Sequence, residues 1–199
     1  MNSEQIARAR VKAETGFSLI ELSVSLIVMM IIAAIAIPSV LQGWNSYRLT
    51  SAADSVAGLL ERTRFEAIHN NSRLTCLSVT PGGLLTIGID ENANAQIDGN
   101  EPRVILPGPA TIVAAGVAPA PASMGAAYAA AAAITPPGIV ATFDARGTVF
   151  SGAGGPPPPY VVYIGISNKP KYGYRAVTIS AMGQVKTWAA SSGGTWIAQ

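Results

Sequence analysis

The stretch that decides the fold is "KAETGFSLIELSVSLIVMMIIAAIAIPSV", residues 12–40. From Leu22 to Tyr47 the tyrosine is the only side chain that ionises, and residues 22–37 are almost wholly apolar. A helix that crosses a membrane needs about 20 such residues, so this segment is long enough to span a bilayer. One carboxylate, Glu21, stands at its start, where a charge carried to mid-bilayer costs about 2.5 to 3.5 kcal/mol. That position requires a reason.

Basic residues precede the apolar segment. Arg8, Arg10 and Lys12 lie within the first 16 residues, ahead of Phe17. Lysine and arginine beside a spanning helix mark the side that stays in the cytoplasm. The sequence therefore predicts a single-pass protein whose C-terminal part faces away from the cytoplasm.

Two familiar interpretations of this segment leave Glu21 without a role. An ordinary secretory signal has a basic start, an apolar core and a small-x-small cleavage site. Ala34-Ile35-Ala36 fits such a site, and cleavage near Ala36 would release a soluble β-domain that begins at Ile37. A plain signal anchor would remain uncut and tether the domain to the membrane. A carboxylate gains nothing in either case.

The heptapeptide "GFSLIEL", residues 16–22, resembles the prepilin cleavage motif of type IV pilins and type II secretion pseudopilins. The resemblance implies that prepilin peptidase cuts between Gly16 and Phe17 and that Phe17 is then methylated. The cut would remove the basic leader, keep the apolar helix and make Glu21 the fifth residue of the mature chain. Pro38 falls where many pilins carry a helix-kinking proline.

The same resemblance implies a role for Glu21. In that family the glutamate of one subunit pairs with the new N-terminal amine of its neighbour. A carboxylate that is costly alone in lipid is stabilised only when this partner arrives. We therefore expect Glu21 to favour assembly in register with other pilins or pseudopilins.

The rest of the chain predicts an α+β fold, in which the long N-terminal helix packs on an antiparallel sheet or sandwich. Apolar residues between Tyr47 and His69 recur at intervals of three and four, as in an amphipathic helix that ends near Asn70-Asn71. The expected buried stripe is Leu49, Ala52, Ala53, Val56, Leu59, Leu60, Thr63 and Ala67. The expected strands are 74–79, 84–89, 103–106, 139–143, 160–167, 174–181 and 184–188.

A chain of 199 residues fits one globular domain with an appendage. We expect a cleaved leader at 1–16, a transmembrane and assembly segment at 17–42, and a periplasmic domain at 43–199. Two stretches rich in Ala, Pro and Gly, near 107–138 and 152–159, are expected to be surface insertions, the first with a short helix near 126–133.

Three further segments resemble the GspH/FimT branch of minor pilins, namely H-type pseudopilins and FimT-like minor pilins. They are "LLERTRFEAIHNN" (59–71), "IDENANAQIDGNEPRVI" (89–105) and "VTISAMGQVKTW" (177–188). The second is expected to be an acidic hairpin loop and the third a closing hairpin built about Gly183. Some FimT-like proteins implicated in DNA uptake carry arginines around that glycine, where this chain has Gln184, Val185 and Lys186. DNA is therefore not an expected partner.

One loop has the spacing of a calcium site. An EF-hand places oxygen ligands at positions 1, 3, 5, 7, 9 and 12 of its loop, with glycine at position 6. Ala95 occupies that sixth position, and strands rather than helices flank the loop. The loop is therefore either a calcium site or a polar hairpin turn that binds no metal. The candidate ligands are Asp90, Asn92, Asn94, Gln96, Asp98 and Glu101.

Other chemistry is largely excluded. The chain has one histidine, His69, and one cysteine, Cys76, far apart, with no Gly-x-Ser-x-Gly elbow and no phosphate-cradling glycine loop. A single cysteine cannot form an internal disulfide, and we expect Cys76 to be a buried strand residue. We therefore predict that the chain is not an enzyme and, calcium apart, holds no cofactor.

The C-terminal third is basic, since no acidic residue follows Asp144. Tyr172, Tyr174 and Trp188 lie among its cations, an arrangement that can stack single-stranded nucleic acid. The same residues are ordinary strand formers on a solvated face, which is the interpretation we favour.

The sequence thus predicts a minor pilin or pseudopilin in the bacterial inner membrane, assembled into a type II secretion pseudopilus or a type IV pilus. Its expected partners are other pilins or pseudopilins through the N-terminal helix, prepilin peptidase, the inner-membrane assembly platform and membrane lipid. The alternatives are a membrane-anchored extracytoplasmic binding module, including one for DNA uptake, and a secreted soluble β-domain.

Overall fold

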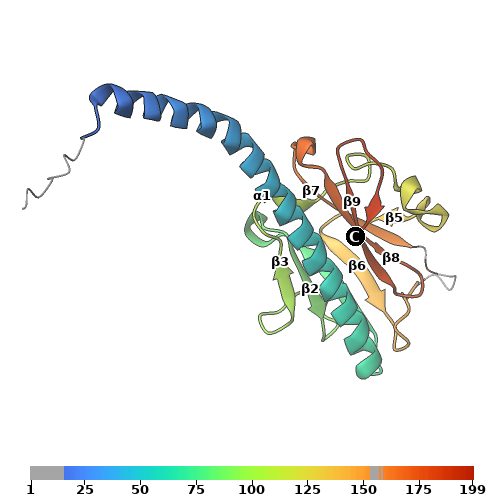
Figure 1. The fold of residues 1–199 in the computed structure, drawn as a ribbon. Coiled ribbons are helices and arrows are strands. Elements are labelled where there is room, and N and C mark those ends of the chain that lie inside the picture. Colours follow the sequence, from blue (N-terminus) through green and yellow to red (C-terminus); the bar gives the residue numbers. More distant parts are fainter. Residues whose placement is uncertain (1–15, 153–156, 158) are drawn as a thin grey trace, which may run out of the picture. The chain divides into compact units, whose positions relative to one another are not determined.

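The computed structural model describes residues 16–152, 157 and 159–199. The predicted leader, up to Thr15, and most of the second insertion lie outside the described residues. The chain divides into two compact units, Met1–Leu41 and Gln42–Gln199. Helix α1, Leu19–His69, begins in the first unit and ends in the second (Figure 1).

Within the second unit, α1 contributes one apolar face to the core. Every residue of the predicted stripe is buried, which confirms the helical periodicity. In the same core lie Cys76 and Phe143 from one sheet and Val162 and Ile179 from the other. The C-terminal part of α1 and both sheets therefore share one hydrophobic core, as expected for an amphipathic helix in an α+β domain.

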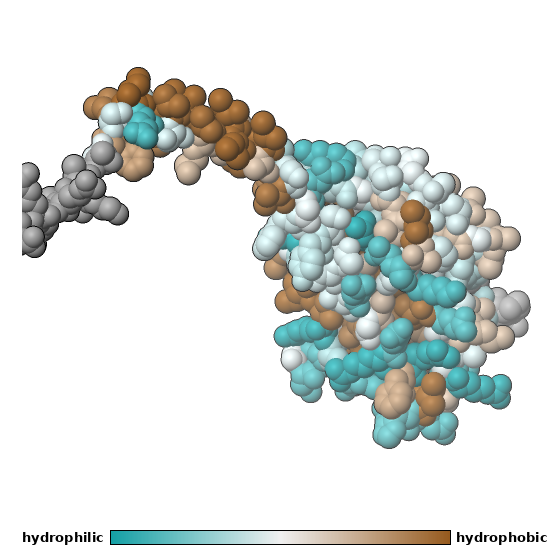
Figure 2. All heavy atoms as spheres, viewed as in Figure 1, coloured by the Kyte–Doolittle hydropathy of each residue, from teal (hydrophilic) through white to brown (hydrophobic). Residues whose placement is uncertain are grey.

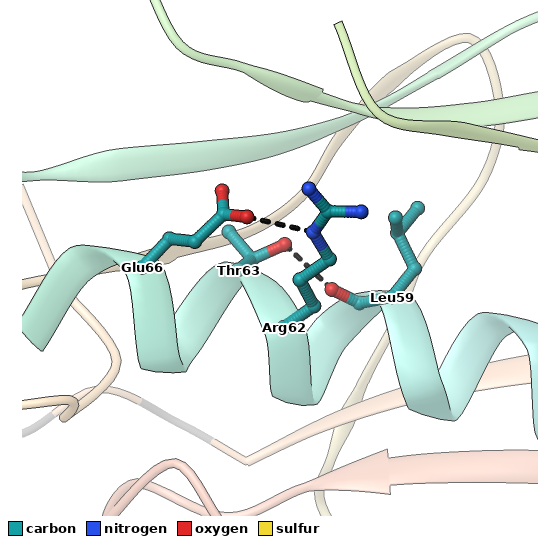
Figure 3. Close-up of polar contacts among 4 residues, drawn as sticks. All are labelled: Leu59, Arg62, Thr63 and Glu66. Atoms are coloured by element: carbon teal, nitrogen blue, oxygen red, sulfur yellow. Dashed lines mark hydrogen bonds and ion pairs between the residues drawn. The ribbon is translucent and has the colours of Figure 1, made fainter. Parts of the chain in front are cut away.

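Figure 3 shows two polar contacts within this part of α1. Arg62 Nε lies 2.6 Å from Glu66 Oε1, one turn further on. The buried Thr63 hydroxyl donates to the Leu59 carbonyl over 2.8 Å. A buried hydroxyl without a partner would be unfavourable, so this bond lets a threonine occupy the core stripe.

The helix ends where the asparagines predict. The backbone N–H of Ser72 donates to the carbonyl of Ala67, and that of Asn71 donates to Ile68. Asn71 has a φ of 47°, in the left-handed region. These bonds form a Schellman motif, in which asparagine is one of the few residues other than glycine that accept the required conformation.

The first sheet is antiparallel and has the order β3-β2-β1-β6. Its strands are β1 (Leu74–Val79), β2 (Thr86–Asp90), β3 (Arg103–Ile105) and β6 (Gly138–Phe143). Strands β2 and β3 form the predicted hairpin, with Gly88 opposite Arg103. All four match predicted strands within two residues at either end.

The second sheet has the order β10-β9-β8-β7-β4, and the short strand β5 pairs in parallel with β7. Three of its strands were predicted: β7 (Tyr160–Ile166), β8 (Tyr174–Ile179) and β9 (Val185–Ala190). Three were not, namely β4 (Ala110–Ile112), β5 (Ala132–Ala133) and β10 (Ile197–Ala198). Each missed strand is only two or three residues long, too short to show the alternation of apolar and polar residues that marks a strand.

The prediction that residues 107–137 are a surface insertion is wrong. Val113, Ala118 and Met124 from this stretch are buried in a second cluster with Tyr163 of β7 and Tyr174 of β8. Along β7 and β8, alternate residues face this cluster and the main core, because successive side chains of a strand point to opposite faces. Both strands are therefore buried on both faces, and the Ala/Pro/Gly-rich stretch supplies the cover.

The short helix expected near 126–133 is present only as one turn of 3-10 helix, Ala126–Tyr128, and the rest of the stretch contains β5.

The C-terminal segment is bonded to the stretch that covers β7 and β8. Trp196 donates from its indole Nε1 to the Pro119 carbonyl (3.1 Å) and from its backbone to Ser123 Oγ (2.9 Å).

Candidate functional site

The predicted processing site lies just before α1. Residues 16–18 are not helical, and they are exposed. Phe17 is 80% exposed, and among the described residues, its chain neighbours apart, nothing lies within 4 Å of where a Cβ of Gly16 would be. The peptide bond between Gly16 and Phe17 is therefore accessible in the described structure.

Ser18 caps the helix that follows. Its Oγ accepts a hydrogen bond from the backbone N–H of Glu21 (3.2 Å), and its carbonyl accepts one from Leu22 (3.1 Å). Ser-x-x-Glu is the sequence of a capping box, and an acidic residue in the first turn is favourable near the positive end of the helix dipole. The bond to Ser18 uses the backbone N–H of Glu21 and not its carboxylate. Sequence reasoning missed this cap, although Ser18 and Glu21 have the spacing of a capping box.

The hydrophobic side chains of the apolar part of α1, residues 19–41, are exposed in this structure. Figure 2 shows the surface of this part as predominantly hydrophobic. By length and composition α1 is able to cross a membrane. The Ser23 hydroxyl donates to the Ile20 carbonyl and the Ser25 hydroxyl to the Glu21 carbonyl, each over 2.8 Å. Such internal bonds are what lipid requires, since it offers polar groups no other partner.

Pro38 lies inside α1 and does not end it. Proline has no backbone N–H, so the carbonyl one turn earlier loses its usual helical partner. The structure therefore places a local weakness in the helix at the residue that the resemblance singles out.

In the loop that follows β2, backbone N–H groups donate hydrogen bonds to two carboxylates at its ends. Asp90 accepts hydrogen bonds from the backbone N–H groups of Asn94 (3.1 Å) and Ala95 (2.9 Å). Glu101 accepts from those of Glu91 (2.9 Å) and Asp98 (2.7 Å). Asp90 and Glu101 are both buried. The first and last predicted calcium ligands thus act as acceptors for the turn of the loop.

Among the remaining candidate ligands, Asn92, Asn94 and Gln96 are exposed and Asp98 is half-buried. The side-chain amides of Asn92 and Asn94 donate to Asp98 Oδ2, over 2.8 and 3.0 Å. Gln96 contributes a backbone N–H bond to Asn94 Oδ1 (2.8 Å). In the described part of the chain no group of three His, Cys, Asp or Glu side chains is placed to hold a metal. Calcium binding at residues 90–101 stays a prediction.

The predicted closing hairpin is present between β8 and β9, and its glycine makes a close tertiary contact. Gly183 has a φ of 76°, and a Cβ there would collide with the Gly147 carbonyl oxygen. Arg64 Nε on α1 donates to that same oxygen over 2.8 Å. Gly183 therefore permits three distant segments to meet.

The interpretation of the basic tail as a solvated face is wrong for two of its residues. Tyr174 and Arg175 are both buried in β8, because this strand is covered on both faces. Arg175 donates to Ser46 Oγ (2.9 Å) and Thr50 Oγ1 (3.0 Å), both on α1. Lys169, Lys171 and Lys186 are exposed, as expected.

Two solved structures are similar: the type IV minor pilin FimU of Pseudomonas aeruginosa (19% identity, 73% of this chain and 94% of that one, TM-score 0.48) and the minor pseudopilin EpsH from the type 2 secretion system of Vibrio cholerae (14% identity, 71% and 97%, TM-score 0.45). No curated protein matches the chain. The profile of a family described as Type II transport protein GspH matches residues 52–183, most of the second unit. Because this match covers more than half of the chain, the protein belongs to the GspH family.

Proposed function

We propose that this chain is a minor pseudopilin or minor pilin subunit that is cleaved between Gly16 and Phe17, methylated at Phe17 and assembled through its N-terminal helix. The filament is a type II secretion pseudopilus or a type IV pilus, and the subunit supports secretion or pilus assembly. GspH family membership supports this class of function, and members of the family are structural subunits rather than enzymes.

The observation that carries the proposal is the position of the cleavage motif relative to the helix. The bond after Gly16 is exposed and non-helical, and the capping residue Ser18 lies on its C-terminal side. Cleavage therefore removes the basic leader and leaves the start of α1 intact. The mature chain begins with an amine four residues before the Glu21 carboxylate.

The proposed topology follows from the apolar helix. Residues 1–16 are the cytoplasmic leader, 17–42 form the membrane and assembly segment, and 43–199 form the periplasmic domain. The partners are prepilin peptidase, the inner-membrane assembly platform, membrane lipid and neighbouring pilins. DNA is not a proposed partner.

Glu21 has two roles in this proposal. Its backbone N–H, at position N3 of the helix, donates to the Ser18 hydroxyl, and its carboxylate pairs with the Phe17 amine of a neighbour. An unpaired carboxylate is unfavourable in lipid, so the second role stabilises the assembled state more than the isolated subunit.

The first test is the N-terminus of the mature protein, measured by mass spectrometry of the membrane fraction. A chain that begins at methylated Phe17 is the expected result. A chain that begins at Ile37 would support the ordinary secretory signal, and an intact Met1 would support the plain anchor. Either of these outcomes would overturn the proposal.

The second test separates the two roles of Glu21. Glu21→Gln keeps a residue that suits a capping box but removes the charge, whereas Glu21→Leu removes both. Both variants are expected to insert and to be cleaved normally, because the cleavage glycine is unchanged and the helix is no less apolar. Both are expected to fail in assembly, measured as processed protein in the membrane against protein in sheared filaments. Normal assembly of Glu21→Gln would show that assembly does not require the charge of Glu21 and would refute the pairing.

A control at the cleavage site completes the test. Gly16→Glu is expected to insert but to stay uncleaved, and therefore to lack the amine that Glu21 needs. Normal secretion or pilus output from uncleaved Gly16→Glu would refute the pilin function itself.

A further inference from the structure

A pocket of about 460 Å³ with two cationic side chains in its lining lies in the second unit. It is formed by the beginning of this unit's part of α1, the turn before β8, and the end of β9 with the segment that follows. Gln42 and Ser46 line it from α1, Lys171 and Arg175 from the turn and β8, and Ser191 and Thr195 from the C-terminal segment. Hydroxyl groups and two cations line this pocket, and no acidic side chain is among its described lining residues.

Arg175 is the unusual member of the pocket, because it is a charged residue with only 9% of its surface exposed. Its acceptors among the described residues are the neutral oxygens of Ser46, Thr50 and the Tyr174 carbonyl. No carboxylate in the described part of the chain lies within salt-bridge distance of it. Buried charges are ordinarily paired, so the positive charge of Arg175 lacks its usual compensation.

The electrostatics agree with this geometry. Burial lowers the pKa of Arg175, and the charge of Asp54, which lies beyond ion-pair distance, raises it in part. The guanidinium has five N–H groups, and three acceptors in the described structure account for three of them. The planar fork of arginine matches the oxygens of a phosphate, and the flexible ammonium of Lys171 at the same pocket adds a second charge.

Chain connectivity indicates where this pocket meets an anion. Gln42, at the pocket, directly follows the apolar segment that ends at Leu41. Trp44 and Tyr47 are exposed just beyond it, and Arg48 lies over the Trp44 ring at 5.4 Å. Tryptophan and tyrosine gather at the headgroup level of membranes, and cationic side chains close to a membrane surface attract the phosphates of lipid headgroups. In an inserted subunit the pocket is therefore within reach of lipid phosphates.

We propose that the pocket between Ser46, Lys171 and Arg175 binds the phosphate of an anionic phospholipid headgroup while the subunit resides in the membrane. That the phosphate belongs to a lipid, and not to another molecule, rests on the proposed membrane insertion. The site itself rests on a buried arginine that has no described carboxylate within salt-bridge distance, and on the pocket that it lines.

The test uses the full chain in neutral detergent micelles, with melting followed by tryptophan fluorescence. The added probes are a short-chain phosphatidylglycerol, a diacylglycerol with the same acyl chains but no phosphate, and inorganic phosphate. Phosphatidylglycerol is expected to raise the melting temperature in a saturable way, whereas diacylglycerol is expected to leave it unchanged. Inorganic phosphate is expected to act only at much higher concentration, because it lacks the acyl chains that the micelle holds beside the pocket.

Variants test the site. Lys171→Ala is expected to weaken the apparent affinity for phosphatidylglycerol about fivefold, the equivalent of the roughly 1 kcal/mol that one lysine contributes near an anionic membrane surface. Arg175→Lys, which loses the fork but keeps the charge, is expected to weaken it about tenfold or more. The matched control is Lys186→Ala, which removes an exposed cation that does not line this pocket.

Three results would overturn the proposal: no effect of phosphatidylglycerol, equal protection by inorganic phosphate at the same concentration, or equal losses in Lys171→Ala and Lys186→Ala. Arg175 supports the fold through Ser46 and Thr50, so the lipid-free melting temperature of Arg175→Lys is measured first. Lys171 is exposed, and its variant carries the test if Arg175→Lys does not fold. None of these outcomes bears on cleavage or filament assembly, so failure here leaves the proposed function to its own experiments.

Discussion

Gly183→Ala perturbs the contact that joins the closing hairpin to the rest of the domain. Gly183 sits at a φ of 76°, where an L side chain is disfavoured by about 1 to 2 kcal/mol. A Cβ would also meet the Gly147 carbonyl oxygen and lie 3.0 Å from Arg64 Nε. The backbone at Gly147 is closely packed itself, since an added Cβ there would lie 2.6 Å from Ile68 Cδ1. The clash is therefore expected to separate the hairpin from Gly147 rather than be absorbed.

The magnitude follows from these parts. Separation strains or breaks the 2.8 Å bond from Arg64 to the Gly147 carbonyl. A hydrogen bond with a charged donor contributes about 1.5 to 3 kcal/mol to stability. Together with the backbone penalty, we expect Gly183→Ala to lower the free energy of unfolding by about 3 kcal/mol. For a chain of this size, that corresponds to a melting temperature lower by roughly 6 to 12 °C.

The measurement is thermal and urea unfolding of the full chain in detergent, wild type beside variant. Gly193→Ala is the matched control, because Gly193 has a similar φ of 71° but no atom within 4 Å of an added Cβ. The control carries the backbone penalty without the collision, and we expect it to cost about 1 kcal/mol. Equal losses in the two variants would refute the argument that close packing against Gly147, and not backbone conformation alone, requires glycine at position 183.

Three further predictions concern single residues or loops. Burial raises the pKa of the Cys76 thiol to about 12, so iodoacetamide at neutral pH is expected to label Cys76 only after unfolding; stoichiometric labelling of the native chain would contradict its placement in the core. Burial tends to raise the pKa of Asp144, but hydrogen bonds from Thr148 and Arg146 outweigh this and lower it. The stability that Asp144 contributes is therefore present above its unfolded-state pKa and is lost as pH falls through the lower folded-state value. Melting curves of Asp144→Asn are expected to depend less on pH in the acid range than those of the wild type, and identical pH profiles would count against this linkage. For the calcium site predicted in loop 90–101, calcium at 100 times its dissociation constant is expected to add about 2.7 kcal/mol of stability relative to chelator, and superimposable melting curves would end that prediction.

Local patterns in the sequence were sufficient for most elements. The three- and four-residue spacing of Leu49 to Ala67 identified the buried face of α1, and Asn70-Asn71 marked its end. Strand β1 matched its prediction at both ends. Such features are predictable because neighbours in the sequence determine helical or extended backbone and its periodicity. The cleavage motif is equally local, since it consists of a few adjacent residues.

Features that depend on distant residues were not predictable in this way. The stretch 107–137 is rich in alanine, proline and glycine and was taken for surface, yet it covers the outer face of β7 and β8. The signal was present in those strands, whose apolar runs "YVVYIGI" and "YRAVTI" are nearly continuous rather than alternating, as expected of strands buried on both faces. What the sequence did not reveal is which segment would cover them.

The pocket at Arg175 shows the same division. Sequence alone determined that the C-terminal third is basic and that an apolar helix leads into the domain. Only the tertiary structure placed Arg175 against Ser46, which lies 129 residues earlier, with no carboxylate of the described residues within salt-bridge distance. Burial and charge compensation depend on groups that folding brings together through space, and one-dimensional spacing carries no record of those distances.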